Sequence, residues 1–323
     1  MRKLLALLAL TTGASGFAQT DAPEDLTITL IPGLTTDAFY ITMNRGAQAA
    51  AEALGITVNF QGAEEFNPTL QVPVLDSVIS RGPDAILIAP TDSTQLIAPL
   101  QNAADRDIPV VTVDTFIGDG QYQTGDGEGD FPLSYVASDN LEGGRIAARA
   151  MAEAVGGEGS VYVSNVRPGI STTDQREQGF KDELAANFPD ITVLETQYNE
   201  NDSSTAASQF QAVLARTPDL KGVFGANLFS ALGAANGVQS ANAQDAVTVI
   251  AFDAPPSIVE NISGGLVDMA IAQHPAEIGY YGVMTAYAAL TGQSVPPLIG
   301  TGFTVITADN VDDPDVQKFI YSE

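Results

Sequence analysis

The sequence predicts an α/β protein made of two doubly wound, parallel-sheet lobes, and three observations predict this class. Short apolar runs alternate with segments whose apolar residues recur at helical spacing. The runs are nearly unbroken in apolar character, which is typical of parallel strands buried on both faces. The alternation restarts near residue 160, and a chain of 323 residues exceeds one ordinary core.

The first half of the chain carries one set of alternating elements. Strands are expected at residues 26–31, 56–60, 85–89, 110–113 and 134–137. Helices are expected at residues 38–54, 69–80, 93–104 and 141–155. Gly55 and Gly156 follow two of these helices, because glycine accepts the left-handed backbone at a helix C-terminus. Asp139 or Asn140 caps the start of the fourth helix.

The second half repeats the pattern. Strands are expected at residues 160–164, 191–194, 222–225, 247–252 and 267–272. Helices are expected at residues 174–187, 203–216, 230–240 and 257–262. Repeated β-α-β units imply parallel sheets with right-handed crossovers, so each set is expected to form one lobe.

Residues 1–18 have the features of a cleaved signal peptide. Arg2 and Lys3 precede an apolar run at residues 4–10, and Gly16 and Ala18 give the small-x-small pattern that signal peptidase reads. A buried first helix is the alternative. No later stretch has the roughly 20 unbroken apolar residues of a membrane span. We therefore expect an exported, periplasmic protein that is not inserted in the membrane.

The charge balance excludes several classes of partner. The chain has 13 Lys plus Arg against 40 Asp plus Glu, a formal net charge of −27. Nucleic acids and anionic membranes are bound mainly through basic residues, so neither is an expected partner. With no Cys and one His, disulfides, thiolate nucleophiles and multi-His metal sites are excluded. We expect no cofactor and no metal.

An acidic, glycine-rich segment at residues 118–130 is the one feature that suggests a cation. Asp126, Glu128 and Asp130 are spaced like calcium-loop ligands. Phe131, however, occupies the position where such loops require glycine. An exposed loop is the favoured interpretation, and calcium binding is left open.

The side chains that follow the apolar strands indicate the function, because open α/β sheets bind ligands beyond the carboxyl ends of their strands. The residues at these positions are Thr91, Asp92, Asp114, Asn165, Arg167, Asn227, Asp253 and Gln273. The alternative is that they form turns and helix caps, as we expect for Asp92. Asn227 and Gln273 stand out because an amide has less capping value there than Asp92.

The first long helix presents Phe39 and Tyr40 near its start. Carboxylates accept hydrogen bonds from hydroxyls, amides fix orientation, and aromatic faces cover the apolar surface of a sugar ring. Together these residue types predict a site for a small neutral sugar or polyol.

Several segments spread over the whole chain resemble the ribose/galactose-type periplasmic binding proteins, the solute receptors of ABC transporters. The resemblance is carried by Pro90-Thr91-Asp92-Ser93, Val113-Asp114, Ala137-Ser138-Asp139-Asn140, Arg176 with Gly179-Phe180, Phe252-Asp253 and Ile271-Ala272-Gln273. It implies the type I fold, whose two lobes are joined by a three-segment hinge. The crossings are then expected near Ser138, His274 and Thr301. The N-terminal lobe comprises 24–137 plus 275–301, and the C-terminal lobe comprises 138–274 plus 302–323.

The resemblance also assigns roles to individual residues. Phe39 and Tyr40 would stack on the sugar, and Asp114 and Asp253 would bind its hydroxyls. The remaining implied ligand-binding residues are Arg176, Asn227 and Gln273, with Asp37, Asn165, Asn201 and Asp202 as additional candidates.

Three positions depart from the ribose-binding pattern. Thr115 stands where that branch has arginine, Ala89 where it has asparagine, and Asp174 where it has a binding arginine. These departures favour another pentose, a hexose or a sugar alcohol over ribose.

The expected function is that of the substrate-binding component of an ABC importer. The protein would close on a monosaccharide or sugar alcohol as a monomer and deliver it to a membrane permease driven by a separate ATPase. The alternative is a glycosidase-like enzyme that uses Asp114 and Asp253 as its carboxylate pair.

Overall fold

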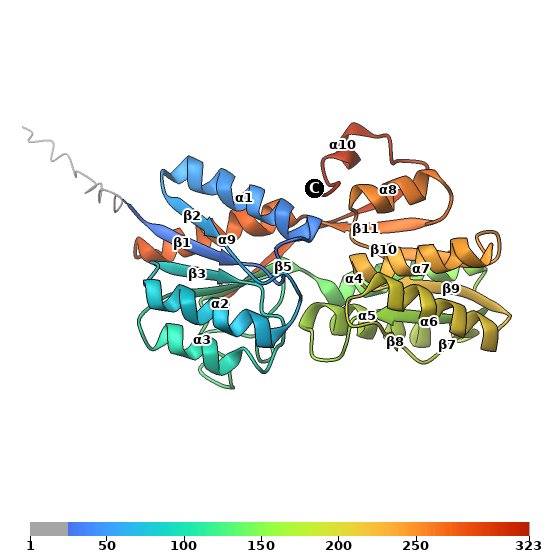
Figure 1. Cartoon of the computed structure of the whole chain (residues 1–323), viewed down its shortest axis with the longest axis horizontal. Coiled ribbons are helices and arrows are strands. Elements are labelled where there is room, and N and C mark those ends of the chain that lie inside the picture. Colours follow the sequence, from blue (N-terminus) through green and yellow to red (C-terminus); the bar gives the residue numbers. More distant parts are fainter. Residues whose placement is uncertain (1–24, 323) are drawn as a thin grey trace, which may run out of the picture.

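The computed structural model describes residues 25–322, and the signal segment predicted at residues 1–18 lies outside them. Two lobes lie side by side, each built on one sheet with helices on both faces (Figure 1). The predicted α/β class with two doubly wound lobes is confirmed.

The N-terminal lobe contains a six-stranded sheet in the order β12-β5-β4-β3-β1-β2, with every neighbouring pair parallel. Its strands are β1 (Thr27–Ile31), β2 (Thr57–Phe60), β3 (Ala85–Ile88), β4 (Val110–Val113), β5 (Ser134–Ser138) and β12 (Leu298–Thr301). Its helices are α1 (Ala38–Leu54), α2 (Pro68–Arg81), α3 (Ile97–Ala104) and α9 (Pro275–Leu290). Two hydrophobic clusters form the core: α1 and α9 contribute to one, α2 and α3 to the other.

The C-terminal lobe contains the sheet β13-β11-β10-β9-β6-β7, and β8 pairs with β6. Its strands are β6 (Gly159–Asn165), β7 (Ile191–Val193), β8 (Gln197–Tyr198), β9 (Leu220–Gly225), β10 (Thr248–Phe252), β11 (Met269–Gln273) and β13 (Phe303–Thr307). Its helices are α4 (Asn140–Val155), α5 (Ser171–Asn187), α6 (Ser203–Arg216), α7 (Leu228–Ala241), α8 (Pro256–Ser263) and α10 (Pro314–Gln317). Helices α4 and α5 contribute to one core cluster, and α6, α7 and α8 to the other.

The structure adds elements that the apolar pattern did not predict. Strands β8, β12 and β13 are short or only partly buried, so they lack an unbroken apolar run. Strand β13 is antiparallel to β11, which makes the second sheet mixed. Helix α5 begins at Ser171, three residues earlier than expected.

The chain passes between the two sheets three times. It leaves the first sheet after Ser138, returns after Gln273, and crosses again between Thr301 and Phe303. The hydroxyls of Ser138 and Thr301 lie 3.2 Å apart, so two of the crossing segments contact each other.

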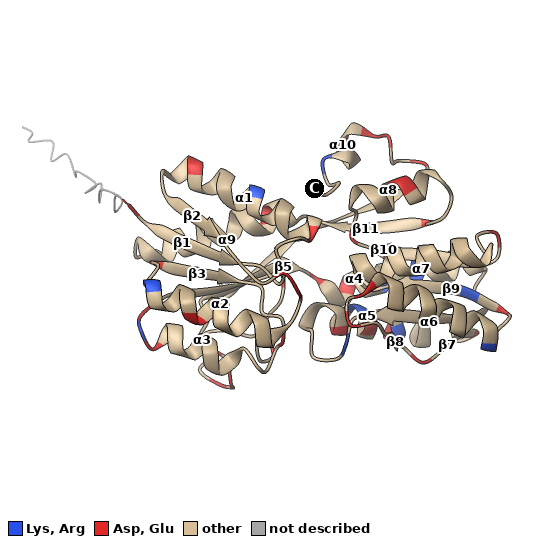
Figure 2. Ribbon diagram, viewed as in Figure 1, with Lys and Arg blue, Asp and Glu red and all other residues tan. Residues whose placement is uncertain are grey.

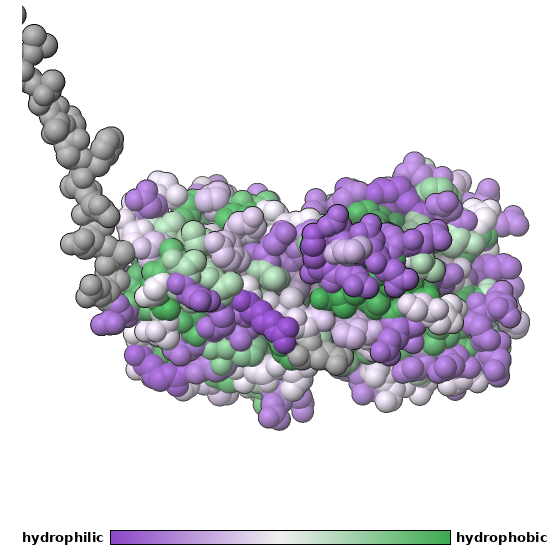
Figure 3. Space-filling model, turned by 90° about the horizontal axis from the view of Figure 1, so that it is seen from above, coloured by the Kyte–Doolittle hydropathy of each residue, from purple (hydrophilic) through white to green (hydrophobic). Residues whose placement is uncertain are grey.

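Acidic residues are spread over both lobes, whereas basic residues are sparse (Figure 2). From above, hydrophilic residues cover much of both lobes and a shallow waist separates them (Figure 3). Most of the negative charge therefore serves solvation of the surface.

Candidate functional site

A pocket lies between the lobes, at the carboxyl ends of strands from both sheets. It is a narrow space, with about 40 Å³ open to the centre of a water-sized sphere. Its lining residues are Leu34, Asp37, Phe39, Tyr40, Phe66, Asp114, Val166, Ile170, Thr172, Thr173, Arg176, Asn201, Asn227 and Asp253. Eight of these residues were singled out from the sequence.

The N-terminus of α1 supplies the aromatic side of the pocket. Asp37 is the N-cap and accepts a hydrogen bond from the Phe39 amide at 2.8 Å, which fixes the first turn. Phe39 and Tyr40 lie edge to face with ring centroids 5.1 Å apart. The Tyr40 hydroxyl donates to Asp114 Oδ2 at 2.8 Å. The two aromatic rings are thus held rigidly beside a carboxylate.

Asp114 and Asp253 supply one carboxylate from each lobe. Both have left-handed backbones, with φ 64° and 76°, a conformation that Asp adopts more readily than most residues. The Asp253 carboxylate accepts hydrogen bonds from Gln273 Nε2, the Tyr321 hydroxyl and the Leu228 amide at 2.9 to 3.1 Å. Asp253 is therefore oriented by three donors before any ligand arrives.

Arg176 on α5 is the only basic residue among those that line the pocket. Its Nε donates to Asn140 Oδ1 at 2.8 Å, and its Nη1 donates to the Ala226 carbonyl at 2.9 Å. The guanidinium carbon lies 3.8 Å from the centre of the Phe252 ring. These contacts fix the planar group and place one positive charge among three carboxylates.

Burial changes the acidity of two pocket carboxyls. Burial, together with the negative charge of Asp253, raises the pKa of Asp37 to about 7. Burial also raises the pKa of Asp114 to about 6, although the Arg176 charge and the Tyr40 hydrogen bond act in the opposite direction. These two carboxyls therefore hold a proton at higher pH than an exposed aspartate does.

Comparison with known proteins assigns the family. The periplasmic binding protein domain family matches residues 28–294, which is most of the chain. The chain belongs to the periplasmic binding protein family. This is a family of solute receptors and not of enzymes, so the glycosidase-like alternative is not retained.

Individual relatives cover nearly the whole chain. The ribose import binding protein RbsB of Escherichia coli is 30% identical over 91% of this chain and 94% of its own length. An ABC transporter solute-binding protein from Agrobacterium vitis, solved with bound α-D-tagatopyranose, is 68% identical with a TM-score of 0.91 and covers 92% of this chain and 100% of its own. Another from the same organism, with bound D-fucose, is 30% identical with a TM-score of 0.85 over 91% of this chain and all of its own.

Several of the predicted residues line this pocket in the structure, and others do not. Asp37, Phe39, Tyr40, Asp114, Arg176, Asn201, Asn227 and Asp253 line it. Gln273 does not line it. The side-chain nitrogen of Gln273 donates to Asp253, so Gln273 affects the pocket through that carboxylate. Asn227 also caps α7 by accepting from the Ser230 amide at 3.1 Å, contrary to the low capping value expected of it.

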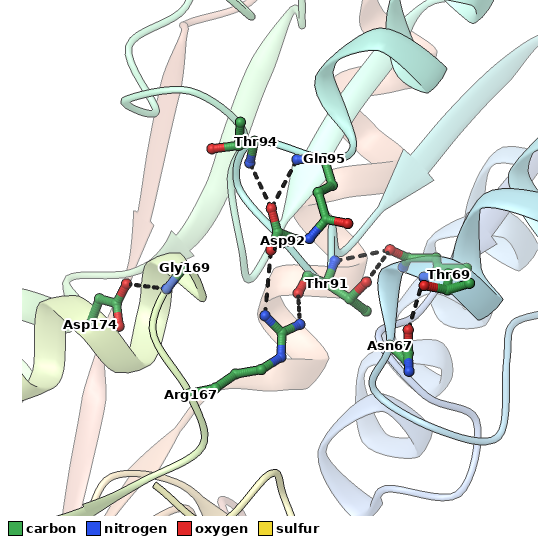
Figure 4. A network of polar contacts seen from close by, with 10 residues as sticks. Asn67, Thr69, Thr91, Asp92, Thr94, Gln95, Arg167, Gly169 and Asp174 are labelled. Atoms are coloured by element: carbon green, nitrogen blue, oxygen red, sulfur yellow. Dashed lines mark hydrogen bonds and ion pairs between the residues drawn. The ribbon is translucent and has the colours of Figure 1, made fainter.

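Two additional candidates have other tasks. Asn165 is fully buried outside the pocket, where its amide nitrogen donates to Glu177 at 2.7 Å. Asp202 caps α6 and lines a neighbouring pocket that shares Asn201 with the first. Asp174, the departure from the family arginine, accepts a hydrogen bond from the Gly169 amide (Figure 4). A position after a strand therefore does not by itself distinguish a helix-capping residue from a ligand-binding residue.

Sequence reasoning missed six lining residues: Leu34, Phe66, Val166, Ile170, Thr172 and Thr173. Thr172 and Thr173 belong to the first turn of α5, which begins earlier than expected. The Thr173 hydroxyl is buried without a hydrogen-bond partner in the described part of the chain. Had the helix been predicted to begin earlier, these two threonines would have been placed on the same helix as Arg176, one turn before it.

The two lobes contact each other directly at the rim of the pocket. Arg167 Nη2 donates to the Thr91 carbonyl at 2.8 Å, and Nη1 lies 3.4 Å from Asp92 Oδ2 (Figure 4). The Ser93 amide donates to the Gly169 carbonyl at 3.1 Å. As expected, Asp92 also caps the turn before α3, through the Thr94 and Gln95 amides. The lobes are thus in a closed arrangement.

Within residues 25–322 there is no group of acidic or histidine side chains placed to hold a metal ion. The Asp130 carboxylate accepts hydrogen bonds from the Thr124 and Gly125 amides instead, so it shapes the acidic loop. None of the described helices is long and apolar enough to span a membrane.

Proposed function

We propose that this protein is the solute receptor of an ABC importer for a monosaccharide, with a ketohexose in its pyranose form as the preferred class. The observation that carries the proposal is the closed pocket in which Asp114, Asp253 and Arg176 face the aromatic pair Phe39 and Tyr40. Carboxylates and a guanidinium match paired hydroxyls, and Phe39 offers an apolar face for ring carbons.

The ligand class is supported by two kinds of observation. The relative with 68% identity binds α-D-tagatopyranose, and others bind D-fucose or carry the name of a ribose receptor. Thr115 and Ala89 replace residues of the ribose-binding pattern. A hexose therefore fits the family relationship and the departures together.

In the proposed mechanism, closure of the two lobes communicates sugar binding to the transporter. In this proposal residues 24–137 plus 275–301 and residues 138–274 plus 302–323 move as two bodies about the three crossings. A sugar held by both lobes stabilises only the closed arrangement, which a membrane permease with its ATPase then recognises. Residues 1–18 direct export to the periplasm, and the receptor acts there as a monomer.

A thermal-shift panel tests the proposal. D-tagatose, D-fructose, D-fucose, D-ribose and galactitol are each added to the protein, and the bound fraction is recovered and identified by mass spectrometry. A ligand that binds only the folded protein raises its melting temperature. We expect the largest shift with D-tagatose and unchanged sugar on recovery. No shift with any sugar, or a chemically altered one, contradicts the proposal.

A further inference from the structure

The last residues of the described chain, 319–322, form a segment that we call the C-terminal strap. It follows α10 and ends between the two lobes, beside α1 (Figure 1). The Tyr321 amide donates to the Ala254 carbonyl at 3.0 Å, next to Asp253. The strap is therefore anchored on the C-terminal lobe at the edge of the sugar pocket.

The Tyr321 hydroxyl holds a pocket carboxylate in place. It donates to Asp253 Oδ1 at 2.9 Å and accepts from the main-chain amide of Gln273 at 2.9 Å. Gln273 Nε2 donates to the same carboxylate oxygen. Tyr321 is 2% exposed and does not line the pocket. It acts on a ligand through Asp253 and is thus a positioning residue.

The strap also contacts the opposite lobe. The Tyr321 ring lies edge to face with Phe39, centroids 5.7 Å apart, and packs into the core cluster of α1 and α9. The Ser322 amide donates to Thr42 Oγ1 on α1 at 2.7 Å. One short segment therefore reaches a ligand-facing carboxylate of one lobe and a ligand-facing aromatic of the other.

The beginning of the strap contacts a crossing between the lobes. The Phe319 ring stacks on His274 at 3.9 Å with 16° between the planes. His274 directly follows β11 and bonds Thr304 of β13 at 3.0 Å. The strap therefore lies beside one of the crossings about which the lobes would rotate.

We propose that the C-terminal strap is a latch that couples the orientation of Asp253 to lobe closure: Tyr321 fixes the carboxylate, and its ring together with the Ser322 amide secures α1 in the closed arrangement. The inference rests on the proposed receptor function for its ligand. The contacts to α1 join the two lobes, so they stabilise the closed arrangement and slow the release of the sugar.

Two near-isosteric variants of the full chain test the latch. Tyr321→Phe removes the hydroxyl, and Thr42→Val removes the acceptor of the Ser322 amide. Tyr122→Phe and Thr291→Val are matched controls. They remove the Tyr122 hydroxyl bonded to Thr112 and the Thr291 hydroxyl bonded to the Tyr287 carbonyl, both away from the pocket.

The kinetic readout is the dissociation rate of D-tagatose in stopped-flow experiments. The latch predicts a rate about 10-fold higher in each test variant, with the association rate within about twofold of the parent. The controls lower the melting temperature and leave the dissociation rate unchanged. Unchanged dissociation in both test variants overturns the latch, because a purely structural role affects only the melting temperature.

A second readout needs no sugar. Because the chain has no cysteine, Ser204→Cys carries a single nitroxide on the C-terminal lobe, and paramagnetic relaxation of amides in α2 reports the population of the closed arrangement. The test variants should lower that population about 10-fold. If D-tagatose does not bind, the ligand assignment fails, but this sugar-free measurement still tests the latch. An unchanged closed population in the test variants overturns the latch.

Discussion

Asp114 and Asp253 occupy equivalent positions in the two lobes. Each directly follows the third strand from one edge of its sheet, β4 and β10, and each has a left-handed backbone. Their amides donate to matching neighbours, Asp114 to the Val136 carbonyl and Asp253 to the Ile271 carbonyl. Closure brings these two equivalent carboxylates to one pocket, and this symmetry underlies the predictions below.

Asp114→Asn should weaken sugar binding by about 10- to 100-fold, the effect of losing a hydrogen bond to a charged acceptor. The change also replaces the acceptor of the Tyr40 hydroxyl. Equilibrium titration with D-tagatose measures the affinity. Asp245→Asn, at an exposed residue, is the control, and equal affinities in the two variants would exclude Asp114 from the binding site.

Arg176→Lys should lower both stability and affinity, although the charge is kept. A lysine cannot reproduce the paired hydrogen bonds to Asn140 and Ala226 or the stacking on Phe252. We expect the melting temperature to fall by roughly 5 °C or more. Thermal unfolding of this variant beside the exposed Arg81→Lys provides the comparison. Matching curves would show that the guanidinium geometry is unimportant.

Arg167→Ala should raise the sugar dissociation rate about three- to fivefold at low salt. The pair with Asp92 joins the lobes but is partly solvated, with side chains 19% and 10% exposed, so only a small effect is expected. The parent and the variant should converge as ionic strength rises, because salt screens the pair. A difference that does not depend on salt would assign the effect to the Thr91 hydrogen bond or to packing instead of the ion pair.

Acid should favour the closed arrangement of the sugar-free protein. The pKa of Asp37 is about 7 and that of Asp114 about 6 in the closed pocket, both above their ordinary value of 3.8. A carboxyl whose pKa is higher in the closed arrangement than in the open one favours closure when it is protonated. With the ordinary pKa of 3.8 in the open arrangement, this contribution is complete below pH 3.8 and is lost as the pH rises to about 7. Relaxation measurements between pH 5 and 8, in roughly half-unit steps, follow the closed fraction.

Asp37→Asn isolates the contribution of one group to this pH dependence. Asparagine keeps the helix cap that Asp37 gives to α1 but does not ionise. The variant should close more readily than the parent at pH 8, with a smaller difference at pH 5. Identical pH profiles would contradict the assignment.

Much of the fold could be predicted from the sequence, because buried parallel strands and amphipathic helices leave clear periodicities. The bounds of α1 and α6 match the expected residues, since Gly55 and Asp202 mark a helix end and a helix start. Strand β13 and the tail that carries Tyr321 could not be predicted in this way. Their residues contact other parts of the chain only through tertiary structure.

The candidate site was predictable where a residue's type and its strand-end position coincide with pocket geometry, as for Asp114 and Asp253. Asn165 has the same local pattern but turns into a buried network with Glu177. Gln273 acts on Asp253 instead of lining the pocket. Local sequence does not contain the direction in which a side chain points, so these differences needed the structure.

Calorimetric titration of D-tagatose into the protein tests the central claim most directly. We predict one sugar bound per chain with a dissociation constant in the micromolar range or tighter, and binding lost in the Asp114→Asn, Asp253→Asn double variant. Absence of binding by D-tagatose and every other monosaccharide tried, or undiminished affinity in the double variant, would contradict the account.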